Sequence, residues 1–270
     1  MTSMLTVDDV TAGFGSTTIL HGLSFAVEPG EIAGIFGLNG AGKSVSMKVL
    51  AGVVPARSGS ITFDGREITS TQAEARVAMG MGHVPQGRQV FANLSVEENL
   101  RLGAYTLRRR DRAKAATMAS AVYDRFPLLA DRRSQLAGTL SGGQQASLAV
   151  ARALVNDPRL VLVDEPSAGL SPVAIGELFD TLKTVAASGV TMVLVEQNVT
   201  FGLELADRAH ILQTGRIVYS GDVGALDRET LAGYLGIGRM LGGGAESALR
   251  SRRRAQRREA RAARRAAAVS

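Results

Sequence analysis

Two segments that lie far apart in the sequence carry residue types that could handle a phosphate group. The first directly follows an apolar stretch, residues 32–36, and consists of Gly37, Leu38, Asn39, Gly40, Ala41, Gly42, Lys43 and Ser44. Its glycines let backbone N–H groups turn toward an anion, and the positive end of the helix that follows points the same way. The spacing matches the phosphate-binding loop GxxxxGK[ST], in which the lysine reaches the outer phosphates and the serine hydroxyl binds Mg²⁺.

The second segment is an apolar stretch, residues 160–163, that ends in Asp164 and Glu165. An aspartate at the end of a buried parallel strand is well placed to hold Mg²⁺. A neighbouring glutamate can orient or deprotonate a water molecule aimed at a phosphate. Paired acids are common on protein surfaces, but together with the glycine-rich loop they indicate a site for ATP and Mg²⁺.

A parallel sheet is needed to bring these segments together. Residues 81–84, 160–163 and 192–195 are apolar nearly throughout, which is typical of parallel strands covered on both faces. We expect a helix over residues 43–50. Further strands are expected at 5–10, 18–27, 32–36 and 60–63, and as a hairpin of 209–212 with 216–219.

Between about residues 90 and 140 the pattern becomes helical. Ser95 and Glu98 form a capping box, and one helix is expected over residues 111–129. The predicted fold is therefore α/β, of the P-loop NTPase type. A parallel-sheet core would carry an N-terminal antiparallel β subdomain and an inserted α-helical subdomain, all within one domain of residues 1–241.

Composition and charge restrict the possible functions. The 270-residue chain has no cysteine, so disulfides and cysteine-based metal sites are absent. Its net charge of +6 comes from residues 245–270, whose nine arginines and two glutamates carry +7, leaving −1 on residues 1–244. A nearly neutral body gives no support to a nucleic-acid groove. We expect no signal peptide at the start and no membrane-spanning segment.

The C-terminal extension, residues 242–270, begins with three glycines and continues with mostly alanine and arginine. Three interpretations stay open. It could be a mobile solvated segment or a loose helix, it could adsorb to anionic lipid headgroups, or it could bind RNA or DNA.

A third motif narrows the class of phosphate-binding protein. Leu140, Ser141, Gly142, Gly143 and Gln144 lie a short way before Asp164. Ser141 can cap a helix, with Gln144 completing a capping box, and the glycines allow close backbone approach to an anion. The segment resembles the LSGGQ signature of the ABC transporter ATPases.

Further segments strengthen this resemblance, which covers about residues 4–236. Gln86 matches the family's Q-loop, residues 167–170 match its D-loop, and Phe14 stands where an aromatic ring stacks on adenine. The resemblance implies that Ser44, Gln86 and Asp164 hold Mg²⁺. It also implies that Glu165, Gln86 and Gln197 act in catalysis, and that the signature contacts ATP on a partner chain. The expected partners are a second ABC ATPase chain, identical or different, and two permease chains, at the cytoplasmic face of the cell membrane.

A narrower resemblance rests on residues 84–91, 136–140 and 194–198. These segments are similar to one of the two ATPase subunits of branched-chain amino acid importers, a pattern shared by the urea and short-chain amide importers. That relationship implies two different ATPases, two permeases and an external solute-binding protein. A soluble ABC ATPase acting on nucleic acid or ribosomes is disfavoured by the single cassette with a short helical region. An exporter ATPase stays an alternative.

Two positions depart from the general family pattern. Gln197 stands where the family has a histidine that contacts the γ-phosphate, as is common in the importer subgroup. Glutamine still donates a neutral hydrogen bond but has no imidazole chemistry. Ser171 stands where many relatives have aspartate at the end of the D-loop.

We predict that deleting residues 245–270 leaves the fold and the basal ATPase activity largely intact. Leu249 and Val269 are the only larger apolar side chains in that segment, so it has little to bury. Thermal unfolding and ATPase assays of the truncated and full chains check this. A large fall in melting temperature would show that the extension packs on the body.

Overall fold

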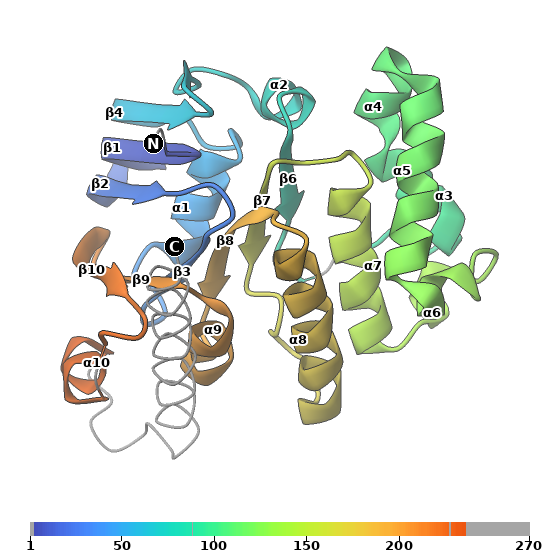
Figure 1. Ribbon diagram of the computed structural model, residues 1–270. Helices are drawn as coiled ribbons and strands as arrows, with labels where there is room; N and C mark the ends of the chain where they lie inside the picture. The colour runs from blue at the N-terminus through green and yellow to red at the C-terminus, as the bar shows by residue number, and fades with distance from the viewer. Residues whose placement is uncertain (1–2, 88, 227, 236–270) are drawn as a thin grey trace, which may run out of the picture.

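A six-stranded sheet runs through the centre of the molecule in the order β10-β9-β3-β8-β7-β6 (Figure 1). Its strands are β3 (Ile32–Phe36), β6 (Met81–Val84), β7 (Leu160–Asp164), β8 (Thr191–Glu196), β9 (Arg208–Gln213) and β10 (Arg216–Asp222). All neighbours are parallel except β9 and β10, which form the expected hairpin. The structure is a computed structural model that describes residues 3–87, 89–226 and 228–235. The predicted parallel core is confirmed.

A second, antiparallel sheet lies beside the first in the order β2-β1-β4-β5. Its strands are β1 (Leu5–Phe14), β2 (Thr17–Val27), β4 (Ala56–Phe63) and β5 (Arg66–Glu67). The strands are longer than expected, because the hydrogen-bonded pairing of β1 with β2 continues to Phe14 and Thr17. The predicted antiparallel subdomain is confirmed.

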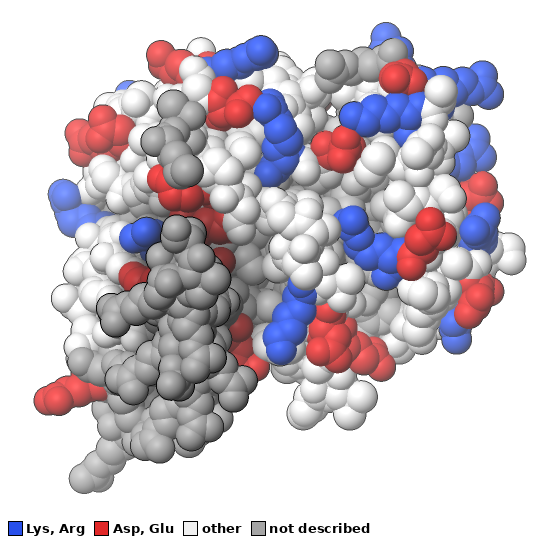
Figure 2. Space-filling model, viewed as in Figure 1, with Lys and Arg blue, Asp and Glu red and all other residues white. Residues whose placement is uncertain are grey.

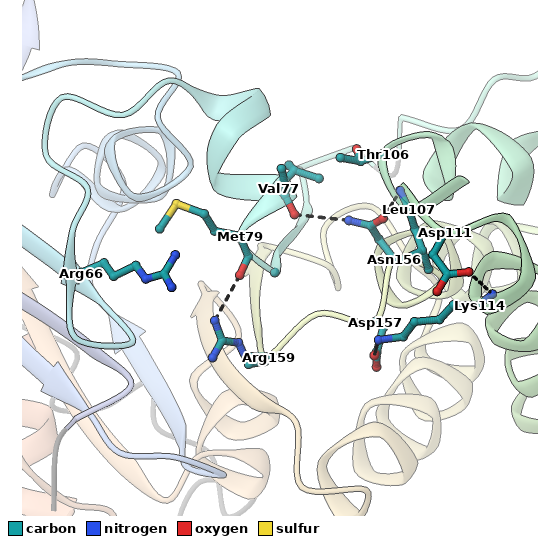
Figure 3. Close-up of a pocket in the computed structure, with 12 residues that line it drawn as sticks. Arg66, Val77, Met79, Thr106, Leu107, Asp111, Lys114, Asn156, Asp157 and Arg159 are labelled. Carbon is teal, nitrogen blue, oxygen red and sulfur yellow. Dashed lines mark hydrogen bonds and ion pairs between the residues drawn. The ribbon is translucent and has the colours of Figure 1, made fainter. Parts of the chain in front are cut away.

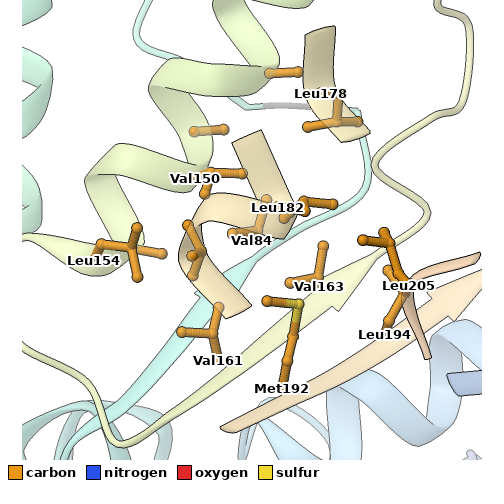
Figure 4. Close-up of a cluster of buried hydrophobic side chains, with 14 of the residues drawn as sticks. Val84, Val150, Leu154, Val161, Val163, Leu178, Leu182, Met192, Leu194 and Leu205 are labelled. Carbon is orange, nitrogen blue, oxygen red and sulfur yellow. The ribbon is translucent and has the colours of Figure 1, made fainter. Parts of the chain in front are cut away.

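Both faces of the central strands are buried, as their continuous apolar sequences predicted. Val161 and Val163 pack on one side with α7 (Gly142–Leu154) and α8 (Pro172–Ala187). Leu160 and Leu162 face the opposite side and pack with α1 (Lys43–Leu50). Figure 4 shows the first of these clusters, with Val84, Val150, Leu154, Val161, Val163, Leu178, Leu182, Met192, Leu194 and Leu205 labelled. Helices α1 and α7 therefore lie on opposite faces of the sheet.

The middle of the chain forms the helical region. It contains α3 (Val96–Gly103), α4 (Tyr105–Arg110), α5 (Arg112–Arg125), α6 (Pro127–Ala130) and the 3₁₀ turn η1 (Ala137–Thr139). Three further helices lie outside this region: α2 (Ala73–Ala78), α9 (Val199–Leu205) and α10 (Arg228–Leu235). Ser95 and Glu98 form the predicted capping box at α3.

The prediction of a single helix over residues 111–129 is wrong. The helix breaks at Phe126, because a residue that precedes proline is disfavoured in helical conformation. Val122, Phe126 and Leu129 are nevertheless all buried in the same core cluster. The predicted apolar contacts therefore form across two helices in place of one.

None of the helices in the described part of the chain is both long and apolar enough to cross a membrane. The C-terminal extension, residues 242–270, lies outside the described residues.

A buried arginine holds the end of the phosphate-loop helix. Arg76 on α2 is 2 % exposed, and its five N–H groups donate to five backbone carbonyls. Two of these belong to Val49 and Leu50 at the C-terminal end of α1, where carbonyls lack helical partners. Burial lowers the pKa of Arg76 to about 10, so the guanidinium stays charged at neutral pH. Arg76 thus fastens α1 to the segment that follows β5.

We predict that Arg76→Met lowers the free energy of unfolding by about 3–5 kcal/mol, the range for removing one partner of a buried charged network. Five carbonyls would lose their donor, and methionine of similar length supplies none. Arg66→Met on exposed β5 is the matched control and should change stability by less than about 0.5 kcal/mol. Urea unfolding followed by circular dichroism measures both, and equal stabilities would contradict this role.

Candidate active site

The phosphate loop joins β3 to α1 on the edge of the sheet where the parallel strands end. Gly40 and Gly42 have φ angles of 80° and 108°, a left-handed conformation that favours glycine. A Cβ atom on Gly37 would lie 2.4 Å from the carbonyl oxygen of Leu212, so glycine is required there as well. α1 begins at Lys43, as predicted, and its first N–H groups lack helical partners. The loop is a backbone cradle suited to an anion.

Lys43 is the buried cation of this cradle. It is 4 % exposed, and its Nζ donates to the carbonyls of Gly37 at 2.9 Å and Leu38 at 3.2 Å. The same atom lies 3.6 Å from Oε1 of Glu165. Ser44 follows in the first turn of α1 and is partly buried. The structure therefore brings Lys43, Ser44 and Glu165, predicted from two distant segments, to one place.

Asp164 ends β7 as a buried carboxylate, 4 % exposed. Its Oδ1 is buried and has no hydrogen-bond partner among the described residues. Burial, with a contribution from the charge of Glu165, raises the pKa of Asp164 to about 6. A buried carboxylate oxygen without a partner is a suitable ligand for a hard cation such as Mg²⁺.

The described residues contain no group of three or more histidine, aspartate or glutamate side chains that could hold a metal by themselves. Mg²⁺ commonly takes one or two protein ligands and completes its shell with water and substrate phosphates. The Asp164 carboxylate and the Ser44 hydroxyl fit that arrangement beside the phosphate loop.

Glu165 is held in an unusual backbone conformation at the end of β7, with a φ of 42°. Its N–H donates to the carbonyl of Val195 on the neighbouring strand at 2.9 Å. The Gln86 side-chain amide donates to Oε2 of Glu165 at 2.8 Å. Each carboxylate oxygen of Glu165 therefore has one partner, Lys43 on one side and Gln86 on the other.

Sequence reasoning assigned no role to a second buried acid next to this site. Glu196, at the end of β8, is 1 % exposed and accepts hydrogen bonds from the N–H and hydroxyl of Ser167 and from the N–H of Asn198. Burial raises its pKa. Glu196 thereby ties the segment after Glu165 to the segment that contains Gln197. The only signal in the sequence is a charged residue that ends an apolar strand.

The remaining predicted residues lie around this centre. Gln197 is exposed directly after β8. Phe14 is 49 % exposed at the end of β1. The adjoining strand β2 contacts the phosphate loop, since a Cβ on Gly42 would lie 3.0 Å from Leu20 Cδ2. Ser171 caps α8 by accepting the N–H of Ala174.

The LSGGQ segment forms the start of α7. Ser141 and Gln144 make the predicted capping box, with the Ser141 N–H donating to Gln144 Oε1 at 3.0 Å. Gly143 packs closely on α8, because a Cβ there would lie 2.6 Å from Glu177 Oε2. Since α7 and α1 lie on opposite faces of the sheet, this segment and the phosphate loop sit on different sides of the chain (Figure 1).

A cavity of about 690 Å³ lies elsewhere, between the sheet core and the helical region (Figure 3). It borders the residues that precede β6 and β7, at the opposite ends of these strands from Gln86 and Asp164. Asn156 bridges it by accepting the Leu107 N–H at 3.0 Å and donating to the Val77 carbonyl at 3.3 Å. An ion pair of Lys114 with Asp157, 2.7 Å between Nζ and Oδ2, also crosses it. These contacts join the helical region to the core.

Comparison with known proteins identifies the family. The ABC transporter family matches residues 20–168, which include the phosphate loop, the signature and both acids. The chain belongs to the ABC transporter ATPases. As a member of this family it binds and hydrolyses ATP.

Several relatives of this ABC ATPase are similar along most of their length. The high-affinity branched-chain amino acid transport ATP-binding protein BraG of Pseudomonas aeruginosa is 42 % identical over 82 % of this chain and 94 % of its own. The probable branched-chain amino acid transport ATP-binding protein LivF of Archaeoglobus fulgidus is 38 % identical over 83 % and 94 %. A crystal structure of an ABC transporter cassette in its ADP conformation superposes with a TM-score of 0.74 at 26 % identity, over 82 % of this chain and 92 % of that one.

We predict that Asp164→Asn stabilises the nucleotide-free ABC ATPase at pH 8 and has little effect near pH 4. The pKa of Asp164 is raised by folding from 3.8 to about 6. Its stabilising contribution is therefore fully present below pH 4 and is lost as the pH rises through 6, where the buried carboxylate must ionise. The gain at pH 8 is on the order of 3 kcal/mol, because the pKa differs by about two units and each unit corresponds to about 1.4 kcal/mol.

Thermal unfolding between pH 4 and pH 8, without nucleotide or divalent cations, measures this effect. The exposed Asp124→Asn on α5 is the matched control and should leave the curve unchanged. A stabilisation by Asp164→Asn that is the same at all pH values would argue against burial as its cause.

Proposed function

We propose that this chain is the ATP-hydrolysing subunit of an importer for branched-chain amino acids or related small solutes, acting on separate permease chains. The observation that carries this proposal is the 42 % identity to BraG over 94 % of that protein, joined by the 38 % identity to LivF. The two relatives come from a bacterium and an archaeon, and both names specify branched-chain amino acid transport. We take residues 1–241 as the ATPase domain, with about 90–140 as its helical subdomain.

In this proposal the loop of residues 37–44 wraps the phosphates of ATP. Lys43 would exchange its two loop carbonyls for phosphate oxygens, which are stronger partners for an ammonium group. Ser44, Asp164 and Gln86 would hold Mg²⁺, which supplies positive charge to the phosphates when bound. Phe14 would stack on the adenine ring, and its exposure leaves the ring free to do so.

Glu165 is the proposed general base. Without nucleotide its charge is shared between Lys43 and Gln86, at 3.6 and 2.8 Å. Once phosphates draw Lys43 away, Oε1 becomes free to accept a proton from a water molecule while Gln86 keeps the carboxylate oriented. Gln197 would offer a neutral amide toward the γ-phosphate, a weaker donor than a charged one. We therefore expect modest hydrolysis at the site built on this chain's loop.

A second ABC ATPase chain, identical or different, is needed to complete the site. The placement of α1 and α7 on opposite faces of the sheet supports this, since it separates the chain's own phosphate loop from the segment Leu140, Ser141, Gly142, Gly143 and Gln144. In the proposed dimer these residues contact the ATP of the partner, using the N-terminus of α7 for the phosphates.

A groove of about 680 Å³ supports contact with a permease at the cytoplasmic face of the membrane. Phe91, Leu102 and Tyr105 line it and are 51 %, 45 % and 60 % exposed. Large exposed apolar side chains that gather at one groove are typical of protein interfaces. The groove lies next to the segment that contains Gln86, so a permease bound there would adjoin the catalytic site. An external solute-binding protein would deliver the solute on the other side.

We predict that this chain, co-expressed with its permeases and partner ATPase in cells lacking their own importer, restores uptake of radiolabelled leucine. Lys43→Ala should abolish uptake and weaken MgATP binding, because no other residue supplies its charge. Glu165→Gln should keep MgATP binding while ATP turnover at this site falls at least about a hundredfold, since general-base catalysis contributes that much. Asp124→Asn serves as the control.

Uptake of no aliphatic amino acid by an intact complex would overturn the importer proposal. Recovery of the chain with an export permease would favour the exporter alternative. Unchanged turnover in Lys43→Ala would exclude the loop from the mechanism.

A further inference from the structure

A small cavity opens between α3 and α5 in the helical region, and none of its lining residues belongs to the phosphate site. Its volume is about 210 Å³, below the range of about 300–1,000 Å³ for drug-sized ligands. The volume is still several times the ~30 Å³ that one water molecule occupies in the liquid. The cavity therefore has the size for one small metabolite.

The walls of this cavity are apolar and narrow. Leu100 and Ala104, from α3 and the residue after it, are 2 % and 3 % exposed. Ala115 and Ala119 lie one turn apart on α5, and their short side chains leave the space open. A surface of this kind favours a short branched aliphatic group over a polar one.

A buried aromatic ring is part of the cavity wall. Tyr123 is 8 % exposed, and the guanidinium carbon of Arg133 lies 3.9 Å from its ring centroid. Its hydroxyl is buried and has no hydrogen-bond partner among the described residues. A rigid wall with an unused polar atom is a common feature of ligand sites and is unusual in a plain packing defect.

The rim carries charges of both signs. Glu97 and Arg101 lie one turn apart on α3, and Arg112 begins α5. All three are exposed, and within the described part of the chain none forms an ion pair. Figure 2 shows acidic and basic side chains interspersed over the helical region on the right of the view. An acid and two arginines beside an apolar hollow complement a zwitterion.

We propose that this cavity binds a small aliphatic α-amino acid in its zwitterionic form. The side chain lies against Ala115 and Ala119, the carboxylate meets the two rim arginines, and the ammonium group meets Glu97. The ligand class coincides with the proposed cargo. The idea that an imported amino acid regulates its own uptake from this site therefore rests on the proposed function. The site itself rests on the cavity.

The position of the cavity gives the ligand a route to the ATPase. α3 packs on α7, the helix that begins at the signature glycines. A ligand wedged between α3 and α5 favours the arrangement of α3 to which it binds best, and so biases the position of the signature. In the feedback proposal, this bias lowers ATP turnover when the amino acid accumulates inside the cell.

Calorimetric titration of the purified full-length chain with L-leucine tests the site. We expect saturable binding that Ala116→Leu weakens at least tenfold by filling the rim. Ala113→Leu is the matched control, because it is exposed on α5 outside the cavity lining and should bind like the wild type. 4-Methylpentanoate, which is leucine without its ammonium group, should bind at least tenfold more weakly than leucine. Leucine should lower the ATPase rate of the assembled transporter at least twofold, but not that of its Ala116→Leu variant.

Absence of saturable leucine binding, equal binding by Ala116→Leu, or equal binding of 4-methylpentanoate would overturn the proposed site. An unchanged ATPase rate with leucine would overturn the feedback. Leucine uptake by the Ala116→Leu transporter separates the two proposals. Leucine uptake by that variant is expected if import stands, whatever the cavity binds. If the wild-type transporter takes up no aliphatic amino acid, the importer proposal is overturned and the proposed site is not.

Discussion

Lys43 and Glu165 face each other across the ends of two buried parallel strands, with 3.6 Å between Nζ and Oε1. Both side chains lose most of their hydration there, so each charge must be met by another group. The fold supplies two loop carbonyls to Lys43 and the Gln86 amide to Glu165. This arrangement requires that β3, β6 and β7 end at the same edge, which a parallel sheet provides. Phosphate oxygens can replace the loop carbonyls as partners of Lys43, so ligand binding can change the contacts of this side chain.

Much of the fold could be predicted because its strongest signals are local. The boundaries of β3 and α1 followed from an apolar run and from the glycine-rich loop that comes after it. The helix expected over residues 111–129 failed, because an apolar stripe averages over many residues while Pro127 acts at one peptide bond. Arg76 was unpredictable in another way. A charged residue in a short helix resembles a solvated one, and its acceptors on α1 lie 26 and 27 residues away.

The residues of the candidate site also fall into those that local sequence patterns predict and those that they do not. The phosphate loop and Asp164 with Glu165 were predictable, since their chemistry is written in residue types at fixed spacing. The hydrogen bonds that Glu196 accepts from Ser167 and Asn198 were not predictable, because they depend on β7 and β8 being neighbours. The orphaned oxygen of Asp164 is likewise a product of tertiary burial. Sequence patterns therefore identify the residues expected to bind the nucleotide. They identify less well the residues that hold those side chains in position.

The helical region meets the rest of the molecule through an apolar seam with α7 and through polar contacts beside a cavity. Apart from the apolar seam with α7, its contacts across the large cavity include the Asn156 side-chain amide and the exposed ion pair of Lys114 with Asp157. Exposed ion pairs contribute only about 0–1 kcal/mol, so this side of the region can shift at small energetic expense. α7 begins at the signature and ends just before Asn156. If the helical region shifts against the core, α7 can carry that shift to the signature residues, which the proposed dimer places at the partner's ATP.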